Sequence, residues 1–231
     1  MRLILAIIGA LILHSQLVAQ PATDYIVKAG QVPGKVLPAE VLYVLPSFKQ
    51  GTVYMRNGEV TKQWLNYNII LDEMQFLGAK GDTLTIAEPA LVKNIRIDSI
   101  YFFYDKTYLQ LKSTVGVYKL AIKQFFVQTP YRTRGGYGIS SGVSAISTFT
   151  SMGFGGRPAT NLMVDKDVAF HKLANFYIGD AFNRFYKADK KTFLNIFAEH
   201  KSSIEKYLRL NKTNFHNPAE LQSLLEFCTL Q

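Results

Sequence analysis

The sequence of 231 residues contains a single cysteine, Cys228. A disulfide joins two thiols, so an intramolecular disulfide is impossible. Because Cys228 falls on the apolar stripe of the last predicted helix, we interpret it as a small core residue rather than as a reactive thiol. No cysteine lies near the end of the N-terminal apolar segment either, which argues against a lipid-anchored lipoprotein.

Motifs of known catalytic and cofactor sites are also missing or out of context. The stretch GISSG at residues 138–142 has the letters GxSxG, but it lies in a Gly/Ser-rich stretch rather than at the strand-to-helix turn of a nucleophile elbow, and no HExxH zinc motif is present. His171, His200 and His216 are widely spaced and match no metal-ligand pattern. Gly136-x-Gly138 lacks the Lys-Ser/Thr pair of a phosphate-binding P-loop. The sequence therefore predicts no catalytic residue, no metal and no cofactor.

Long apolar runs are confined to the N-terminus. Residues 1–19 combine Arg2, an apolar run from Leu3 to Leu13, and the small residue Ala19. This pattern is typical of a cleavable secretory signal, and the run is shorter than the roughly 20 residues of a membrane-spanning helix. We expect an exported protein that is periplasmic, outer-membrane-associated or secreted.

Acidic residues are outnumbered, with 17 Asp and Glu against 26 Lys and Arg, so the formal net charge is +9. In an exported protein this charge favours anionic partners of the cell envelope, such as an acidic polysaccharide or a lipid surface, over nucleic acid. An envelope protein is a further predicted partner. The same charge can also simply keep the protein soluble, and the oligomeric state stays open.

What the sequence does contain is the pattern of a sheet. Apolar residues make up 48% of the chain, Tyr and Phe are frequent, and the length suits one domain. The strongest local signal lies in residues 51–71, where two extended segments meet at Asn57-Gly58. This pair favours a two-residue type I′ hairpin turn, which would place Met55 opposite Val60. Further short strands with turn signals between them predict an antiparallel β-meander, either an open sheet or small and barrel-like.

The predicted organisation is α+β in one domain. A first strand is expected at residues 41–45, and a slip in the alternation predicts a β-bulge near Trp64. The expected segments are an irregular N-terminal arm at 20–40, the sheet at 41–130, a flexible Gly/Ser-rich loop at 131–160, and a β-hairpin with C-terminal helices at 161–231.

Capping residues mark the predicted helices. Asp189 is placed to cap a helix, and Asn217-Pro218-Ala219-Glu220 combines a capping residue, a first-turn proline and an acidic third position. Apolar residues at helical spacing follow each start. Before these helices, Gly179-Asp180 lies between two extended segments, which predicts a hairpin.

The Gly/Ser-rich loop is the one segment for which we predict binding. Arginines bracket it and tyrosines offer ring faces, so it suits an anionic ligand. A plain linker between sheet and helices is the competing interpretation. The predicted binding surface consists of Tyr131, Arg132, Arg134, Tyr137 and Arg157.

Three stretches carry a resemblance: GTVYMRNGEVTKQWLNYNIILDEMQFL followed by KGDTL, a YG-then-serine-rich stretch, and the ending KKTFLNIFAEHKSSIEKYLRLNKTNFHNPAELQSLLEFC. Together they resemble a group of exported proteins common in Bacteroidota. The resemblance covers most of the mature chain and implies a cell-envelope or secreted setting. It implies no activity and no site residues.

Three classes of function follow from these patterns. The first is an exported, envelope-associated binding or structural module without catalytic activity, which the charge and the Gly/Ser-rich loop favour. The second is an enzyme whose site is assembled from distant residues, for example two carboxylates from separate strands. The third is a small outer-membrane barrel protein, which the short strands and the helical ending disfavour.

Overall fold

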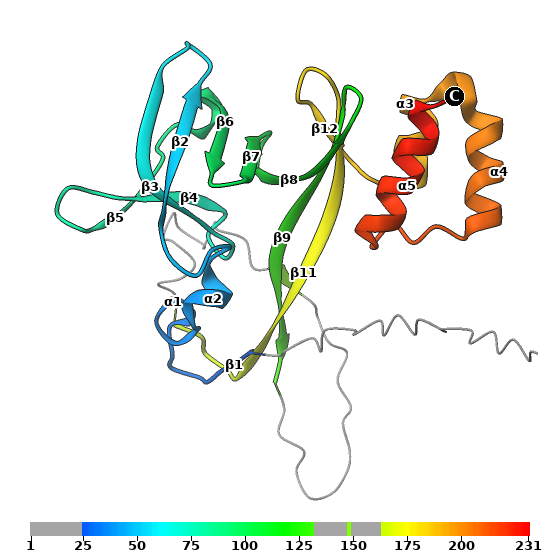
Figure 1. The fold of residues 1–231 in the computed structure, drawn as a ribbon. Helices are drawn as coiled ribbons and strands as arrows, with labels where there is room; N and C mark the ends of the chain where they lie inside the picture. Colours follow the sequence, from blue (N-terminus) through cyan, green and yellow to red (C-terminus); the bar gives the residue numbers. More distant parts are fainter. Residues whose placement is uncertain (1–24, 132–146, 149–162) are drawn as a thin grey trace, which may run out of the picture.

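The computed structural model describes residues 25–131, 147–148 and 163–231. It has a mixed α+β fold with a large open antiparallel sheet and C-terminal helices, as predicted (Figure 1). The strands are β1 (Tyr25–Val27), β2 (Lys49–Met55), β3 (Val60–Asn68), β4 (Glu73–Leu77), β5 (Thr83–Thr85), β6 (Val92–Ile97), β7 (Ile100–Tyr104), β8 (Tyr108–Val115), β9 (Tyr118–Pro130), β10 (Ser147–Thr148), β11 (Val168–Gly179) and β12 (Phe185–Lys187). The helices are α1 (Pro33–Val36), α2 (Ala39–Leu42), α3 (Lys190–Ile196), α4 (Lys201–Asn211) and α5 (Pro218–Thr229), with short 3-10 turns η1 (Pro89–Leu91) and η3 (Ala198–His200).

Two meanders are joined side by side. The strand order is β1-β11-β9-β8-β7-β6-β2-β3-β4-β5, with β10 beside β9 and β12 beside β11. Consecutive hairpins link β2 to β5 and β6 to β9, and the two series meet where β2 pairs with β6. The sheet is open, because its first and last strands, β1 and β5, are not paired with each other.

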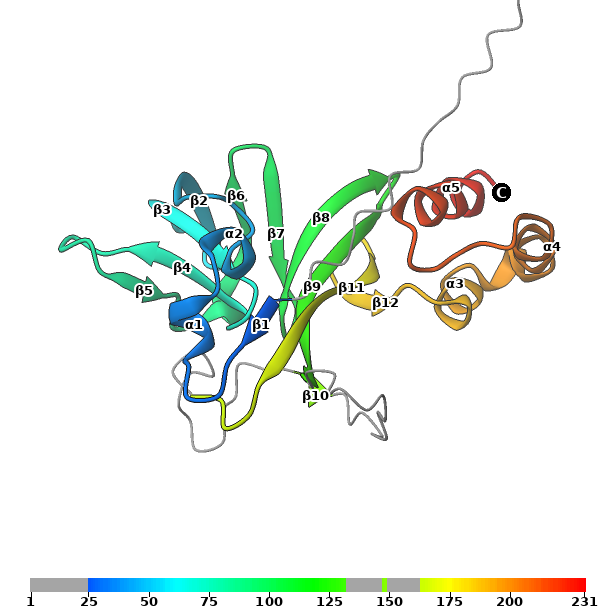
Figure 2. The ribbon, with the colours of Figure 1, turned by 90° about the horizontal axis from the view of Figure 1, so that it is seen from below.

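The sheet contributes to two hydrophobic cores. The first core lies among α2, strands β2 to β4, and β6 and β7, with Leu65, Ile95 and Phe102 fully enclosed. The second lies between α3 to α5 and one end of β9 and β11, with Phe193, Leu224 and others enclosed. In both ribbon views the three helices stand apart from the β2–β6 part of the sheet, with β9 and β11 between them (Figures 1 and 2).

The long pair β9 and β11 serves both cores. Its register is continuous along twelve residues of β11, so residues of the same parity share one face. Ile122 and Phe176 nevertheless belong to the second core, whereas Phe126 and Phe170 belong to the first. The strong twist of a narrow ribbon turns one face from the helices at one end to the first core at the other.

The first hairpin turns at the predicted place with a different geometry. Gly58 N donates to Met55 O at 3.2 Å, Met55 N donates to Glu59 O at 2.9 Å, and Tyr54 lies opposite Val60. Only Gly58 in this turn has positive φ, at 92°, whereas a type I′ turn needs two such residues. The predicted two-residue turn and the pairing of Met55 with Val60 are therefore wrong, because a three-residue loop shifts the register by one.

The β-bulge predicted near Trp64 is wrong as well. Pairing of β2 with β3 runs without a shift from Lys49 opposite Leu65 to Tyr54 opposite Val60. The alternation lapses because the first half of β3 is largely solvent-exposed, whereas its last four residues are all buried. The register shifts instead where β2 meets β6, between Tyr54 and Met55.

The described part of the N-terminal arm is regular, contrary to prediction. β1 pairs with β11, and Val27 is completely buried in the first core. The strand expected at residues 41–45 is also wrong, because α2 covers residues 39–42 and Tyr43 makes only an isolated bridge to Asn68. Leu42 N donates to Pro38 O at 3.1 Å and Tyr43 N to Ala39 O at 2.9 Å, so these backbone groups are satisfied within the helical turn rather than by a neighbouring strand.

The predictions for the C-terminal part are confirmed. β11 and β12 form the hairpin at Gly179-Asp180. The Asp189 side chain accepts from Thr192 N at 2.8 Å and caps α3. Asn217 Oδ1 accepts from Ala219 N at 3.0 Å and Glu220 N at 3.4 Å and caps α5. Cys228 is buried in the second core, and burial raises the pKa of its thiol to about 12.

Candidate functional site

Most of the predicted binding surface lies outside the described residues, including Arg132, Arg134, Tyr137 and Arg157. Of this set the structure describes Tyr131, which follows the end of β9. Its backbone N donates to Asp167 O at 2.9 Å, and Lys28 Nζ lies 5.3 Å from its ring centroid. Lys28 also forms an ion pair with Asp167 at 2.7 Å. Tyr131 thus belongs to the junction of β1, β9 and the segment before β11.

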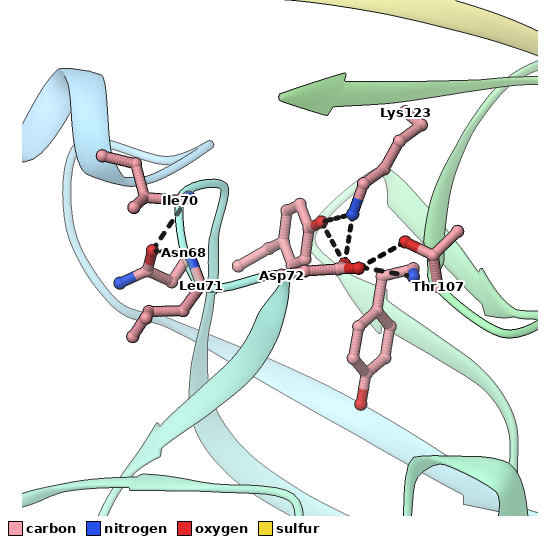
Figure 3. A network of polar contacts seen from close by, with 8 residues as sticks. Asn68, Ile70, Leu71, Asp72, Thr107 and Lys123 are labelled. Atoms are coloured by element: carbon pink, nitrogen blue, oxygen red, sulfur yellow. Dashed lines mark hydrogen bonds and ion pairs between the residues drawn. The ribbon is translucent and has the colours of Figure 1, made fainter. Parts of the chain in front are cut away.

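A polar network built on Asp72 joins three distant segments (Figure 3). Asp72 lies in the β3–β4 turn with a left-handed φ of 58°. Its carboxylate accepts from Tyr67 Oη at 2.7 Å and from Thr107 Oγ1 at 2.6 Å, and forms an ion pair with Lys123 of β9. Lys123 Nζ also donates to Tyr67 Oη at 2.6 Å. The β3–β4 turn, the β7–β8 turn and β9 are therefore tied at one point.

Burial sets the electrostatics of this network. It lowers the pKa of Lys123, an effect that the Asp72 carboxylate opposes. Burial, reinforced by the charge of Asp72, raises the pKa of Tyr67 well above its ordinary value. The Lys123 side chain is 12% exposed, and its ammonium is shared by two acceptors. Since these charged groups satisfy one another, we interpret the network as a structural junction.

A second feature is the outward side of the sheet where the two meanders meet. Thr52 of β2 lies opposite Lys62 of β3 on one side and Arg96 of β6 on the other, and Arg96 lies opposite Tyr101 of β7. Directly paired residues of antiparallel strands project from the same face. Lys62, Thr52, Arg96 and Tyr101 therefore form one row across four neighbouring strands. We call this row and the adjacent pair Gln50 and Trp64 the outer sheet face.

The outer sheet face is hollowed at its centre. A polar depression of about 250 Å³ is lined by Gln50, Gly51, Thr52, Lys62, Arg96 and Asp98. Gly51 is required there, because a Cβ at this position would lie 2.8 Å from Arg96 O and from the Leu65 side chain. Glycine thus lets β2 lie tightly between its neighbours beneath the depression.

Two aromatic rings flank this depression. Trp64, opposite Gln50, is 50% exposed, and Tyr101, opposite Arg96, is 37% exposed. β3 and β7 are three strand spacings apart, and Trp64 lies two residues along β3 from Lys62, so the two aromatic positions are separated by roughly 16 Å. Lys62 and Arg96 form no ion pair with any described residue. The outer sheet face therefore offers two cations that have no ion pair within the described part of the chain, each beside an exposed ring.

Sequence reasoning missed this face for a physical reason. The local alternation of β2 and β3 is readable, but the pairing of β2 with β6 joins strands separated by three other strands in the chain. Nothing local in the sequence brings Arg96 beside Thr52.

Comparison with protein-family models, with curated proteins and with solved structures found no match to this chain. Within the ranges that the structure describes, no group of three or more His, Cys, Asp or Glu side chains could hold a metal ion. None of the helices in the described part of the chain is long and apolar enough to cross a membrane.

Proposed function

We propose that this protein is an exported, envelope-associated binding module without catalytic activity, and that its ligand is an anionic polysaccharide. The observation that carries the proposal is the outer sheet face, where Lys62 and Arg96, which form no ion pair with a described residue, lie beside the exposed rings of Trp64 and Tyr101. The export signal predicted for residues 1–19 and the net charge of +9 support the envelope setting.

The chemistry of the face matches an acidic sugar chain. Arg96 suits bidentate contact with a carboxylate or sulfate, and Lys62 adds a second positive charge. Gln50, Thr52 and Asp98 supply an amide, a hydroxyl and a carboxylate that pair with sugar hydroxyls. The electron-rich faces of Trp64 and Tyr101 suit the C–H edges of sugar rings. The span between the rings favours a chain of sugars over a single one.

The sole tryptophan provides the test, because Trp64 lies on the proposed binding face. Intrinsic fluorescence of the mature protein is titrated with polygalacturonate, with dextran sulfate and with neutral dextran. We expect a saturable change with at least one charged polymer and none with neutral dextran. The affinity should fall as salt is added, because salt screens the cations.

Variants show whether binding depends on the outer sheet face or only on the net charge of the protein. Arg96→Ala and Lys62→Ala should each weaken binding at least about tenfold, because each loses a charge-assisted contact. Lys206→Ala, an exposed lysine of α4, removes the same charge elsewhere and should leave affinity unchanged. Binding that Lys206→Ala weakens as much as Arg96→Ala, or no response to either charged polymer, would refute the proposal.

A further inference from the structure

Two hairpin turns lie side by side at the end of the β9–β11 pair. Lys119, just after the β8–β9 turn, is paired with Gly179, just before the β11–β12 turn. Lys119 Nζ also donates to Asp180 O at 3.5 Å, which links the two turns directly. Both loops project from the same end of the ribbon, near the C-terminus (Figure 1).

This end exposes large apolar side chains. Phe182 in the β11–β12 turn is 77% exposed, Val117 in the β8–β9 turn is 59% exposed, and Leu230 after α5 is 84% exposed. Val117 and Gln231 line one hollow of about 500 Å³, so the C-terminus lies next to the β8–β9 turn. We call Val117, Phe182 and Leu230 the apolar tip.

The turn that carries Phe182 is firmly built. Asp180 Oδ1 accepts from Phe182 N at 2.9 Å and from Arg184 N at 3.0 Å, and Asn183 N donates to Asp180 O at 3.0 Å. These bonds hold the backbone while the Phe182 ring projects outward. The only ring contact of Phe182 within the described residues is the Arg184 guanidinium, 5.2 Å from its centroid. Exposing such a ring to water is unfavourable, and moving it into an apolar environment would recover that free energy.

Basic side chains stand beside the apolar tip. Lys119 lies just after the β8–β9 turn, and Arg184 lies in the β11–β12 turn next to Phe185, the first residue of β12. Arg184 is offset by Asp180 at 2.7 Å, whereas Lys119 has no ion pair among the described residues. Apolar side chains that project beyond a basic rim match the boundary of an anionic lipid bilayer, where rings enter the headgroup region and cations stay among the phosphates.

We propose that the apolar tip docks this protein reversibly on an anionic lipid surface, with Phe182 and Val117 entering the headgroup region. A bilayer fits better than a protein partner, because two hairpin turns and a helix end form a projecting end rather than the broad face that a stable protein interface needs. The inference is independent of the proposed polysaccharide site, since that site is built on β2, β3, β6 and β7 and the apolar tip on the β8–β9 turn, the β11–β12 turn and the end of α5.

The test uses the full mature chain and vesicles of phosphatidylcholine, with and without phosphatidylglycerol. We expect the protein to cosediment with the phosphatidylglycerol vesicles and weakly with neutral ones. Phe182→Ser should lower the partition coefficient about tenfold, because one ring is no longer buried in lipid. Leu210→Ser is the matched control: Leu210 is 69% exposed on α4, so its change should leave partitioning unaffected.

Fluorescence gives a second readout. In a Trp64→Phe background, Phe182→Trp places the only tryptophan at the apolar tip, and its emission should shift to the blue on vesicle addition. Thermal melts check that each variant folds. The proposal is overturned if wild-type protein stays in the supernatant, if Phe182→Ser and Leu210→Ser behave alike, or if the emission does not move.

Discussion

The two cores of this protein are built in different ways. Of the buried polar side chains of the described residues, Asn66, Asn68 and Gln75 belong to β3 and β4 beside the first core, whereas Thr52 lies on the outer sheet face. The second core encloses apolar side chains from three helices and the end of a strand pair. The first core is thus enclosed by hydrogen-bonded polar groups as well as apolar ones, and the second by apolar packing.

The difference follows from how backbone groups are satisfied. Helices α3 to α5 satisfy their interior backbone internally, so they only need apolar stripes and caps to pack. The irregular chain beside β3 has no such ladder. The Asn66 side chain supplies hydrogen bonds in place of a ladder: it accepts from Leu45 N at 3.1 Å and donates to Leu45 O at 2.9 Å. Asn68 likewise accepts from Ile70 N and Leu71 N (Figure 3).

The largest expected effect is a cavity in the second core. Leu224 is completely buried, so Leu224→Ala should lower the free energy of unfolding by about 2 to 5 kcal/mol. Urea unfolding measures the loss. As a control, Ser223→Ala at the exposed neighbouring position should change the free energy of unfolding by less than about 0.5 kcal/mol. Amide exchange should quicken in β2 to β4 as well, because β9 and β11 belong to both cores. Faster exchange in the helices alone would mean that the two cores unfold separately.

Next in size is the junction at Asp72. Asp72→Ala removes the counter-charge of the buried Lys123 ammonium, and we expect a loss of roughly 1 to 3 kcal/mol in urea unfolding. This range is below that of a fully buried pair, because the Asp72 side chain is 27% exposed and partly screened. Adding Lys123→Met should restore part of the loss. A double variant as unstable as the sum of both single variants would contradict the coupling.

Alkaline pH should weaken the same junction. The pKa of Tyr67 in the folded protein is well above the value of 10.0 for an unfolded tyrosine. The folded state therefore keeps a proton that the unfolded state loses, so this stability is complete below about pH 10 and falls above it. For each such group, the free energy of unfolding changes by at most about 1.4 kcal/mol per pH unit. Lys123 acts in the opposite direction, because its folded pKa is lowered from 10.5. Tyr67→Phe should flatten the decline measured by urea unfolding between about pH 10 and about pH 11; an unchanged decline would assign it to other groups.

The smallest effect is expected at Tyr108 in the first core. Its hydroxyl is buried and has no hydrogen-bond partner among the described residues. Tyr108→Phe keeps the ring contact with Tyr104, at 5.0 Å between centroids, and removes the unpaired oxygen. Thermal melting should show unchanged stability or a gain of up to about 1 kcal/mol. A clear loss would show that the hydroxyl is satisfied in solution.

The predictions from sequence succeeded where the signal was local. The caps at Asp189 and Asn217 act on backbone groups two or three residues away, and the turn at Gly179 joins adjacent strands. The turn at Asn57-Gly58 was located, but its type was not, because a two-residue and a three-residue loop share the same glycine signal. The helical turn at residues 39–42 was missed, since four residues carry too little periodicity.

The sequence by itself determined the antiparallel hairpins, the helix starts and the burial of Cys228, because neighbours in the chain fix these features. Only the tertiary structure decided which strands meet across the fold. The pairing of β2 with β6 places Arg96 beside Thr52, and the meeting of two turns with β9 brings Lys123 to Asp72. Such contacts form only when the entropy lost in closing long loops is offset by the burial of both cores. No local pattern of residues encodes this balance of free energies.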